Sequence, residues 1–278
     1  MKKFYFIFSF IVVCISCSSD SSSVSVNPNL LQRVDFFPGT ISERRWLFND
    51  DGLLTSITKA DGTIVGSFTY DSHNRLISST TVDYMGTIEN HSFTYDSNDF
   101  VTTVDGVTLI YNSSLNGFYT GNLNSYYSLT ILNSEKLLTY RKTVNIEEVE
   151  VGVFDETVLD EMIVSYGDNG NILGYSPNES CNYLSYDDKA NPLRNATLAI
   201  CKAFAFISNS NWVDGQYNST NNVLSHDYCS EDPESEVYHY TYNTNNLPII
   251  QTRDDYYLGA YEATTTSAKY YYQGDVIP

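Results

Sequence analysis

Hydrophobic and polar positions alternate along most of this 278-residue chain, and such a pattern with a period of two predicts β-strands. Two short runs rich in strand-forming residues, 100–104 and 107–111, flank Asp105-Gly106. A two-residue Asp-Gly loop between such runs is typical of a hairpin with a type I′ turn. Asp61-Gly62 predicts a second hairpin turn. We therefore expect roughly fifteen or more antiparallel strands joined mainly by tight turns.

A degenerate repeat dominates the chain after Leu31. Each copy has an aromatic residue, then Asp, Asn or Gly, then polar residues, then an aliphatic residue. Asp and Asn side chains hydrogen-bond to the backbone two residues on, and Asn or Gly accepts a positive φ. Each copy is therefore predicted to be a β-turn between antiparallel strands. The seven copies begin at Phe48, Tyr70, Tyr95, Tyr166, Tyr186, Tyr217 and Tyr242.

One segment departs from the strand pattern. Pro192 stands where a first helical residue would, and Ala, Leu, Ile and Lys follow it, so a short helix is predicted near 192–206. The expected fold of residues 31–278 is all-β, a large antiparallel β-meander of hairpins curled into a barrel or half-barrel. A sheet of this many strands does not stay flat. A two-sheet sandwich is the alternative.

The amino terminus predicts export and lipid attachment. Lys2 and Lys3 precede an apolar run, 4–15, which ends in Ile15-Ser16-Cys17. This pattern is typical of a lipoprotein signal peptide, residues 1–16, with Cys17 as the lipidated residue. The run is too short to cross a ~30 Å hydrocarbon core. Residues 17–30 are rich in serine and predict a flexible linker.

We therefore expect an outer-membrane lipoprotein of the cell envelope, on the periplasmic face or the cell surface, which contacts the membrane through its Cys17 lipid. Without residues 1–16 the net charge changes from −19 to −21. Such a surface repels phosphate backbones, so nucleic acid is not an expected partner. No spacing typical of a zinc or calcium site occurs, and no metal or cofactor is expected.

Three cysteines remain for disulfide chemistry in an oxidising compartment: Cys181, Cys201 and Cys229. They cannot all pair with one another. We favour a Cys181–Cys201 disulfide, because the segment between these two residues looks like a compact excursion from the sheet. Other pairings stay open.

The repeat copies, Tyr70-Asp71 to Leu76 most closely, resemble the YD repeats of Rhs and teneurin proteins. Those proteins wind many repeats into a hollow shell, and so few copies imply hairpins without an enclosed cargo. A wider resemblance is to uncharacterised Bacteroidota lipoproteins with YD-like repeats. It is carried by the lipobox, by Tyr186 to Leu193 and by Asn221-Asn222-Val223. This resemblance implies a porin-like β fold and an envelope location, and it supplies no catalytic residues.

No nucleophile elbow, phosphate-binding loop or zinc-hydrolase motif occurs, so we do not expect an enzyme. The 24 Tyr, 14 Phe and 2 Trp residues are the remaining candidates for binding. We predict a lipid-anchored, non-catalytic binding or interaction module for a glycan or envelope protein. The alternative is a carrier or structural β protein that covers an apolar ligand. An aromatic row on an open face would favour the module, and a closed aliphatic cavity would favour the carrier. The candidate aromatic surface is Tyr126, Tyr127, Trp212, Tyr256, Tyr257 and Tyr271.

Overall fold

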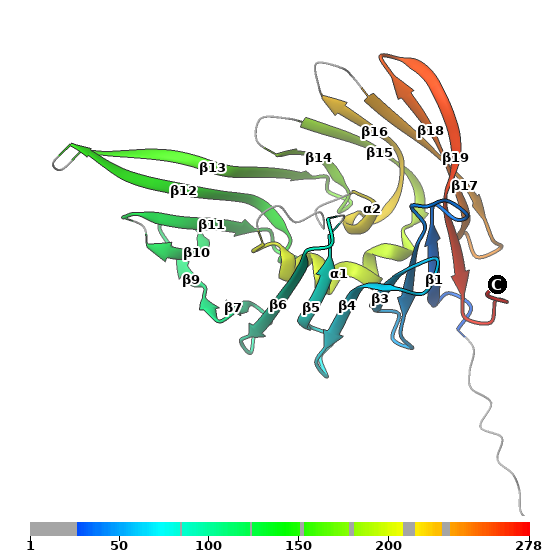
Figure 1. The fold of residues 1–278 in the computed structure, drawn as a ribbon, viewed down its shortest axis with the longest axis horizontal. Helices are drawn as coiled ribbons and strands as arrows, with labels where there is room; N and C mark the ends of the chain where they lie inside the picture. The colour runs from blue at the N-terminus through cyan, green and yellow to red at the C-terminus, as the bar shows by residue number, and fades with distance from the viewer. Residues whose placement is uncertain are drawn as a thin grey trace, which may run out of the picture.

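The strands form one antiparallel sheet that curls into a nearly closed barrel around a short helix (Figure 1). The computed structural model describes residues 27–83, 85–122, 124–150, 153–177, 181–207, 215–229 and 234–278. The first half of the chain supplies β1 (Leu31–Phe36), β2 (Arg44–Phe48), β3 (Leu54–Lys59), β4 (Ile64–Tyr70), β5 (Leu76–Val82), β6 (Ile88–Tyr95), β7 (Val101–Val104), β8 (Val107–Thr108), β9 (Ile110–Asn112), β10 (Gly117–Asn122) and β11 (Tyr126–Leu132). The second half supplies β12 (Leu138–Glu150), β13 (Val153–Tyr166), β14 (Ile172–Pro177), β15 (Cys181–Ala190), α1 (Pro192–Phe204), α2 (Gly215–Asn218), β16 (Asn221–Cys229), β17 (Glu234–Tyr242), β18 (Pro248–Tyr257) and β19 (Ala260–Tyr272).

Neighbours in sequence are neighbours in the sheet. Except for β8 and β9, each strand pairs with the next one, and β19 returns to pair with β1, with Val34 opposite Tyr270. The ladder of the described residues breaks between β8 and β9, which flank Leu109. There β8 pairs with β7 and β9 pairs with β10. The expected all-β meander, curled into a barrel, is confirmed, and the sandwich alternative is wrong.

Five of the predicted repeat copies form tight turns. In the copy at Tyr70, Asp71 Oδ1 accepts the backbone N–H groups of His73 at 2.9 Å and Arg75 at 3.0 Å. Asn74 takes the positive φ, at 60°. Tyr70 then lies opposite Leu76 in the ladder. The copies at Phe48, Tyr95, Tyr166 and Tyr242 likewise join adjacent strands, and residues 132–138 form a further turn of this kind that the sequence pattern did not reveal.

Because these repeat turns are every second connection of the meander, they all lie at the same end of the barrel, which we call the turn end. A second regularity links neighbouring repeats. The tyrosine hydroxyl of one repeat donates to a backbone carbonyl of the preceding repeat: Tyr70 to Leu54 at 2.6 Å, Tyr95 to Leu76 at 2.7 Å. Burial raises the pKa of both hydroxyls, so each stays a hydrogen-bond donor. Some of the tyrosine residues therefore have a structural role, because their hydroxyl groups join neighbouring repeats.

The copies at Tyr186 and Tyr217 are not turns, and this part of the repeat prediction is wrong. Tyr186 lies opposite Val223 in the ladder, and the chain between them leaves the sheet to form α1 and α2. Tyr217 itself lies in α2. Asp187 Oδ1 accepts the backbone N–H of Lys189 at 2.9 Å, as in an ordinary copy, but its second backbone donor is Asn222 at 3.1 Å. The two helices are thus an insertion into a single repeat.

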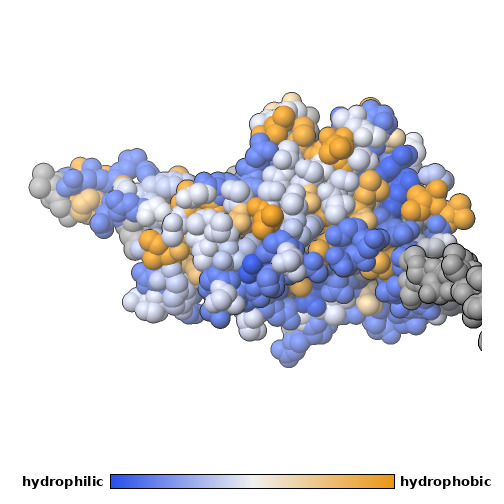
Figure 2. All heavy atoms as spheres, turned by 90° about the horizontal axis from the view of Figure 1, so that it is seen from below, coloured by the Kyte–Doolittle hydropathy of each residue, from blue (hydrophilic) through white to orange (hydrophobic). Residues whose placement is uncertain are grey.

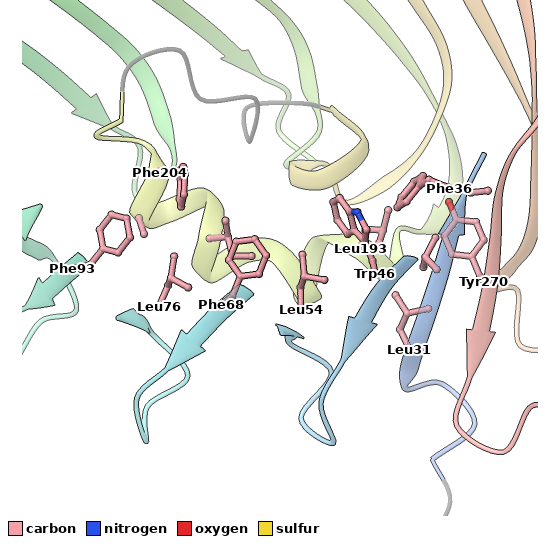
Figure 3. Packing of buried hydrophobic residues seen from close by; sticks show 14 of the residues in the cluster. Leu31, Phe36, Trp46, Leu54, Phe68, Leu76, Phe93, Leu193, Phe204 and Tyr270 are labelled. Atoms are coloured by element: carbon pink, nitrogen blue, oxygen red, sulfur yellow. The ribbon is translucent and has the colours of Figure 1, made fainter. Parts of the chain in front are cut away.

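The predicted helix near 192–206 is confirmed as α1, which lies inside the barrel (Figures 1 and 3). Pro192 occupies the first turn, and the side chain of Asn191 caps the helix by accepting the N–H of Leu193 at 3.0 Å. Leu193, Ile200 and Phe204 are buried against inward-facing side chains of the wall, among them Leu54, Leu76 and Phe93. The core of the molecule is therefore the contact between helix and barrel wall. We call α1 and α2 together the plug.

Candidate functional site

The plug leaves a cavity of about 460 Å³ inside the barrel, which we call the plug cavity. It reaches Thr81 and Val82, at the end of β5 that is remote from the turn end, and Phe37 and Ser42 in the connection from β1 to β2. Its volume lies within the range of small-molecule binding pockets, roughly 300–1,000 Å³. The remaining lining comes from α2, from the neighbouring strands β1, β2, β3 and β4, and from β17, β18 and β19.

Aromatic rings form one wall of the plug cavity. Trp46 projects inward from β2, where it lies opposite Val34 and Ile57 in the two adjoining ladders. Its ring stacks on that of Tyr217 from α2, with centroids 5.2 Å apart and planes inclined by 30°. Phe36 meets Trp46 edge to face at 5.0 Å. Such arrangements stabilise each other beyond simple burial, so this wall is fixed before any ligand arrives.

Polar side chains line another part of the plug cavity. The guanidinium of Arg253 on β18 is paired with Glu236 on β17 at 2.5 Å and with Asp255 at 2.8 Å. Glu236 also accepts the hydroxyl of Tyr238, and Gln216 Nε2 from the plug donates to that same hydroxyl at 2.8 Å. Burial alone would lower the pKa of Arg253, but the two carboxylates outweigh burial and raise it. Arg253 is therefore a permanent cation.

A second set of polar groups extends this polar lining along the barrel. Gln251 Nε2 donates to the Tyr240 hydroxyl at 2.6 Å, and Ser267 Oγ donates to Gln251 Oε1 at 2.9 Å. Both residues are buried and line the plug cavity. Because every one of these side chains is held by another, the polar lining offers a fixed pattern of donors and acceptors.

The plug is positioned by two residues that the sequence pattern did not single out. Asn191, besides capping α1, donates from Nδ2 to the carbonyl oxygens of Gln216 at 2.8 Å and Ser219 at 3.1 Å, and so fastens α2 to the start of α1. Gly215 begins α2, and a Cβ there would come within 2.3 Å of a methyl group of Leu184. Any larger residue here would force the side chains of Leu184 and Tyr186 to shift, so glycine permits the close approach of α2 to β15.

The predicted aromatic surface is dispersed. Tyr126 is half-exposed and Tyr127 is buried on β11, whereas Tyr256 and Tyr257 lie near the end of β18, on another part of the barrel (Figure 1). Tyr271 on β19 is half-buried beneath the guanidinium of Arg33, 5.5 Å from its ring centroid. Trp212 and Cys17 lie outside the described residues. Binding by these aromatic side chains stays a prediction.

The structure gathers a different aromatic group, Phe36, Trp46 and Tyr217, around the plug cavity. Tyr217 escaped the sequence analysis because it was assigned to a turn, and Trp46 because nothing local distinguishes it from other strand residues. Pro192 and the absence of strand formers predicted the helix, but no sequence signal reported which way the helix would project.

Of the three cysteines, Cys201 lies in the plug, and Cys181 and Cys229 lie in β15 and β16, the two strands that flank the plug in sequence. Cys201 is buried on α1, with its Sγ 4.0 Å from Oγ1 of Thr197. The ladder between β15 and β16 places the backbone of Cys181 opposite that of Cys229. The predicted Cys181–Cys201 disulfide stays untested, and the register offers Cys229 as another partner.

Within the described residues no group of three or more histidine, cysteine or acidic side chains is placed to hold a metal ion. Neither helix of that part of the chain is long and apolar enough to cross a membrane. The plug cavity thus presents aromatic faces and organic polar groups.

Comparison with known proteins adds a repeat family and several structures. Residues 48–84 match the RHS Repeat family. No curated protein matches the chain. A porin-like protein from Bacteroides uniformis ATCC 8492 shares 13 % identity over 89 % of this chain and 99 % of its own, with a TM-score of 0.45. A porin-like protein from Bacteroides vulgatus ATCC 8482 shares 10 % identity over 71 % of this chain and 97 % of its own, with a TM-score of 0.27.

A larger assembly, TcdB2-TccC3-TEV, shares 10 % identity over 84 % of this chain, with a TM-score of 0.22, and only 16 % of that chain is covered. The RHS match runs from Phe48, the last residue of β2, to just beyond β5, and it includes the two repeat turns after Phe48 and Tyr70. It agrees with the hydrogen bonds that Asn49 and Asp71 make in those turns.

Proposed function

We propose that this protein is a non-catalytic binding module of the cell envelope, anchored through a lipid on Cys17, and that it binds a saccharide in the plug cavity. The observation that carries the proposal is the combination of groups that line this cavity: the stacked rings of Trp46 and Tyr217, together with the polar side chains of Gln216 and Arg253. A sugar ring has apolar C–H faces and a rim of hydroxyl groups. Aromatic faces suit the former, and fixed donors and acceptors suit the latter.

The RHS match supports the division of labour that this proposal assumes. Repeat turns and their tyrosine hydroxyls build the wall, and the insertion into one repeat carries α2 into the lumen, where Gln216 and Tyr217 complete the plug cavity. Two of the four binding groups, Gln216 and Tyr217, therefore come from the part of the chain that departs from the repeat, and Trp46 and Arg253 come from strands of the wall. A carrier of a wholly apolar ligand has less support, because charged Arg44 and Arg253 line this cavity.

A glycan array probed with the purified full chain tests the proposal. Val82→Trp would fill the plug cavity from the end of β5, and Gln216→Ala would remove one donor. Each variant is expected to weaken a saturable glycan signal at least tenfold. Tyr126→Ala is the matched control, because it removes an exposed aromatic ring far from the cavity, and it should bind as the unmodified protein does.

Undiminished binding by Val82→Trp would exclude the plug cavity as the site. Loss of binding in Tyr126→Ala would transfer the site to the dispersed aromatic surface. Release of any product from a bound glycan, measured by chromatography after overnight incubation, would contradict the non-catalytic part of the proposal.

Anchoring is tested separately, by incorporation of radiolabelled palmitate in the native host. Cys17→Ala should abolish incorporation, because the variant lacks the sulfur that carries the lipid, and with the lipid it loses about 0.8 kcal/mol of membrane affinity for each buried methylene. Cys201→Ala is the control and should incorporate label normally. Label retained by Cys17→Ala would overturn the lipid anchor and leave the glycan proposal intact.

A further inference from the structure

A second cavity, of about 290 Å³, lies on the other side of α1, at the turn end of the barrel. It is lined by residues from four repeat turns and by the face of α1 that carries Asn195, Leu198, Ala199 and Lys202. We call it the turn-end pocket. The molecule seen from below is largely polar, with hydrophobic residues in scattered groups (Figure 2).

The charge of the turn-end pocket is opposite to that of the protein. The chain has 34 acidic and 15 basic residues, yet this pocket is lined by Arg75, Lys136, Lys202 and His73 against the single acid Asp99. Asp99 is already engaged, because its carboxylate lies 2.9 Å from Nη1 of Arg75. An excess of cations here is therefore a local feature and does not follow from composition.

Lys136 and Lys202 differ from Arg75 in that neither ammonium forms an ion pair within the described residues. Arg75 is neutralised by Asp71 at 2.7 Å and by Asp99. Lys136 donates to the backbone carbonyl of Asn98, and its ammonium lies 4.6 Å from the ring centroid of Phe100. Within the described residues neither lysine has a carboxylate partner.

Lys202 is held in an unfavourable place for a free ammonium. It lies in the last turn of α1 and is half-buried. Burial, reinforced by the nearby charge of Lys136, lowers its pKa even though the carboxylates of Glu135 and Asp99 act in the opposite direction. An anion between Lys136 and Lys202 would offset both effects, because it restores a charge partner in a site partly shielded from water. The remaining lining is apolar and includes Val101, Leu132, Leu198 and Phe206.

We propose that the turn-end pocket binds a small amphiphilic anion, whose carboxylate or phosphate head lies between Lys136 and Lys202 and whose short apolar body packs on the aliphatic floor. The volume is at the lower limit of ligand pockets and suits a chain of about eight carbons. This site is separate from the plug cavity and does not depend on the proposed saccharide binding.

Isothermal titration of the purified full chain tests the proposal with three probes that share one tail: octanoate, octyl phosphate and the neutral octyl glucoside. At least one anionic probe should bind saturably below its micelle concentration, and more tightly than octyl glucoside by tenfold or more. The affinity should fall as salt is added. Octanoate and octyl phosphate, compared with each other, distinguish a carboxylate from a phosphate head.

Lys202→Met keeps the length and helix preference of the side chain and should weaken binding of the anionic probe at least tenfold. Lys59→Met, at the end of β3, is the matched control and should bind as the unmodified protein does. Leu198→Trp fills the floor and should also abolish binding, so the test survives if Lys202→Met folds poorly. Absence of binding, equal affinity for octyl glucoside, or undiminished affinity in both pocket variants would overturn the proposal.

Discussion

The repeat at Tyr70 and the repeat at Tyr186 begin alike and end differently. In the first, the carboxylate of Asp71 binds the N–H groups of His73 and Arg75, and the chain returns to the sheet at once. In the second, Asp187 binds Lys189 but takes its other backbone donor from Asn222, 35 residues further along the chain. The same kind of aspartate hydrogen bonding therefore closes a short turn at Asp71, whereas at Asp187 it joins the two strands that flank an insertion.

This difference separates scaffold from site. The turns of ordinary repeats are closed by local hydrogen bonds, and their other bonds reach the adjacent repeat. The interrupted repeat depends on partners from distant parts of the chain: Asn171 and Asn221 bond reciprocally, and Tyr242 donates to Asp187. Both candidate pockets touch the plug that the interrupted repeat carries. Variants in the interrupted repeat should therefore cost more stability than matched variants in ordinary repeats.

The largest effect on stability is expected from a disulfide between β15 and β16, the two strands that flank the insertion. Residues directly opposite in an antiparallel ladder have Cα atoms about 4.5–5.5 Å apart, within the range that a disulfide spans. The register sets Cys181 opposite Cys229, so we expect a Cys181–Cys229 linkage in the exported protein. Closing a loop of this length contributes about 4 kcal/mol in the chain-entropy description. Reduction should lower the melting temperature by roughly 10 °C.

Mass spectrometry of an unreduced digest measures this linkage directly. Cys201→Ala is the matched control, and the linked peptide with Cys181 and Cys229 should persist in it. A peptide linking Cys181 to Cys201 would instead establish the pairing that the sequence alone favoured, and would contradict the pairing inferred from the register.

The next largest effect is expected at the aspartates that open the two repeats. Asp187→Ala removes the bonds to Lys189, to the backbone and Nδ2 of Asn222, and to the Tyr242 hydroxyl. We expect a loss of about 3 kcal/mol in the free energy of unfolding, measured by urea denaturation. Asp71→Ala, whose lost partners are confined to the next four residues, should cost about half as much. Equal losses in the two variants would show that the bonds from Asp187 to Asn222 and Tyr242 add no stability beyond that of an ordinary repeat turn.

The comparison also shows why the fold was more predictable than the site. Turns such as Asp71 to Arg75 are determined within five residues, so the hairpins, the barrel and the helix at Pro192 could be inferred from local patterns. The copy at Tyr217 satisfied the same pattern but lies in α2, because Asn191 and the glycine at 215 fix that segment inside the barrel. The position of the site depends on contacts between residues far apart in sequence, and a local sequence pattern cannot predict such contacts.

A smaller effect is expected where the tyrosine hydroxyls bridge repeats. The Tyr95 hydroxyl donates to the carbonyl of Leu76 at 2.7 Å, whereas the Tyr186 hydroxyl donates to the carbonyl of Ile172 at 2.5 Å and also accepts from Ser219 Oγ at 2.8 Å. Tyr95→Phe should cost about 1 kcal/mol and Tyr186→Phe about 2 kcal/mol in urea denaturation. Similar costs in the two variants would mean that the contact with Ser219 contributes nothing measurable.

The smallest effect separates repeat turns that begin with Asp from those that begin with Asn. Backbone donation, chiefly from Phe100, lowers the pKa of Asp96 in the folded protein, whereas the turns at Asn133 and Asn243 have no group that titrates there. A carboxyl whose folded pKa lies below its unfolded value stabilises the protein above the unfolded pKa, and this contribution is lost as the pH falls through the folded pKa. Asp96→Asn keeps the acceptor and should therefore reduce the fall in melting temperature between about pH 6 and pH 2.5. Asp50→Asn removes one exposed charge without touching a turn acceptor and serves as the control. An equal fall in Asp96→Asn, in this control and in the unmodified protein would show that the aspartate turns do not determine the acid sensitivity of the barrel.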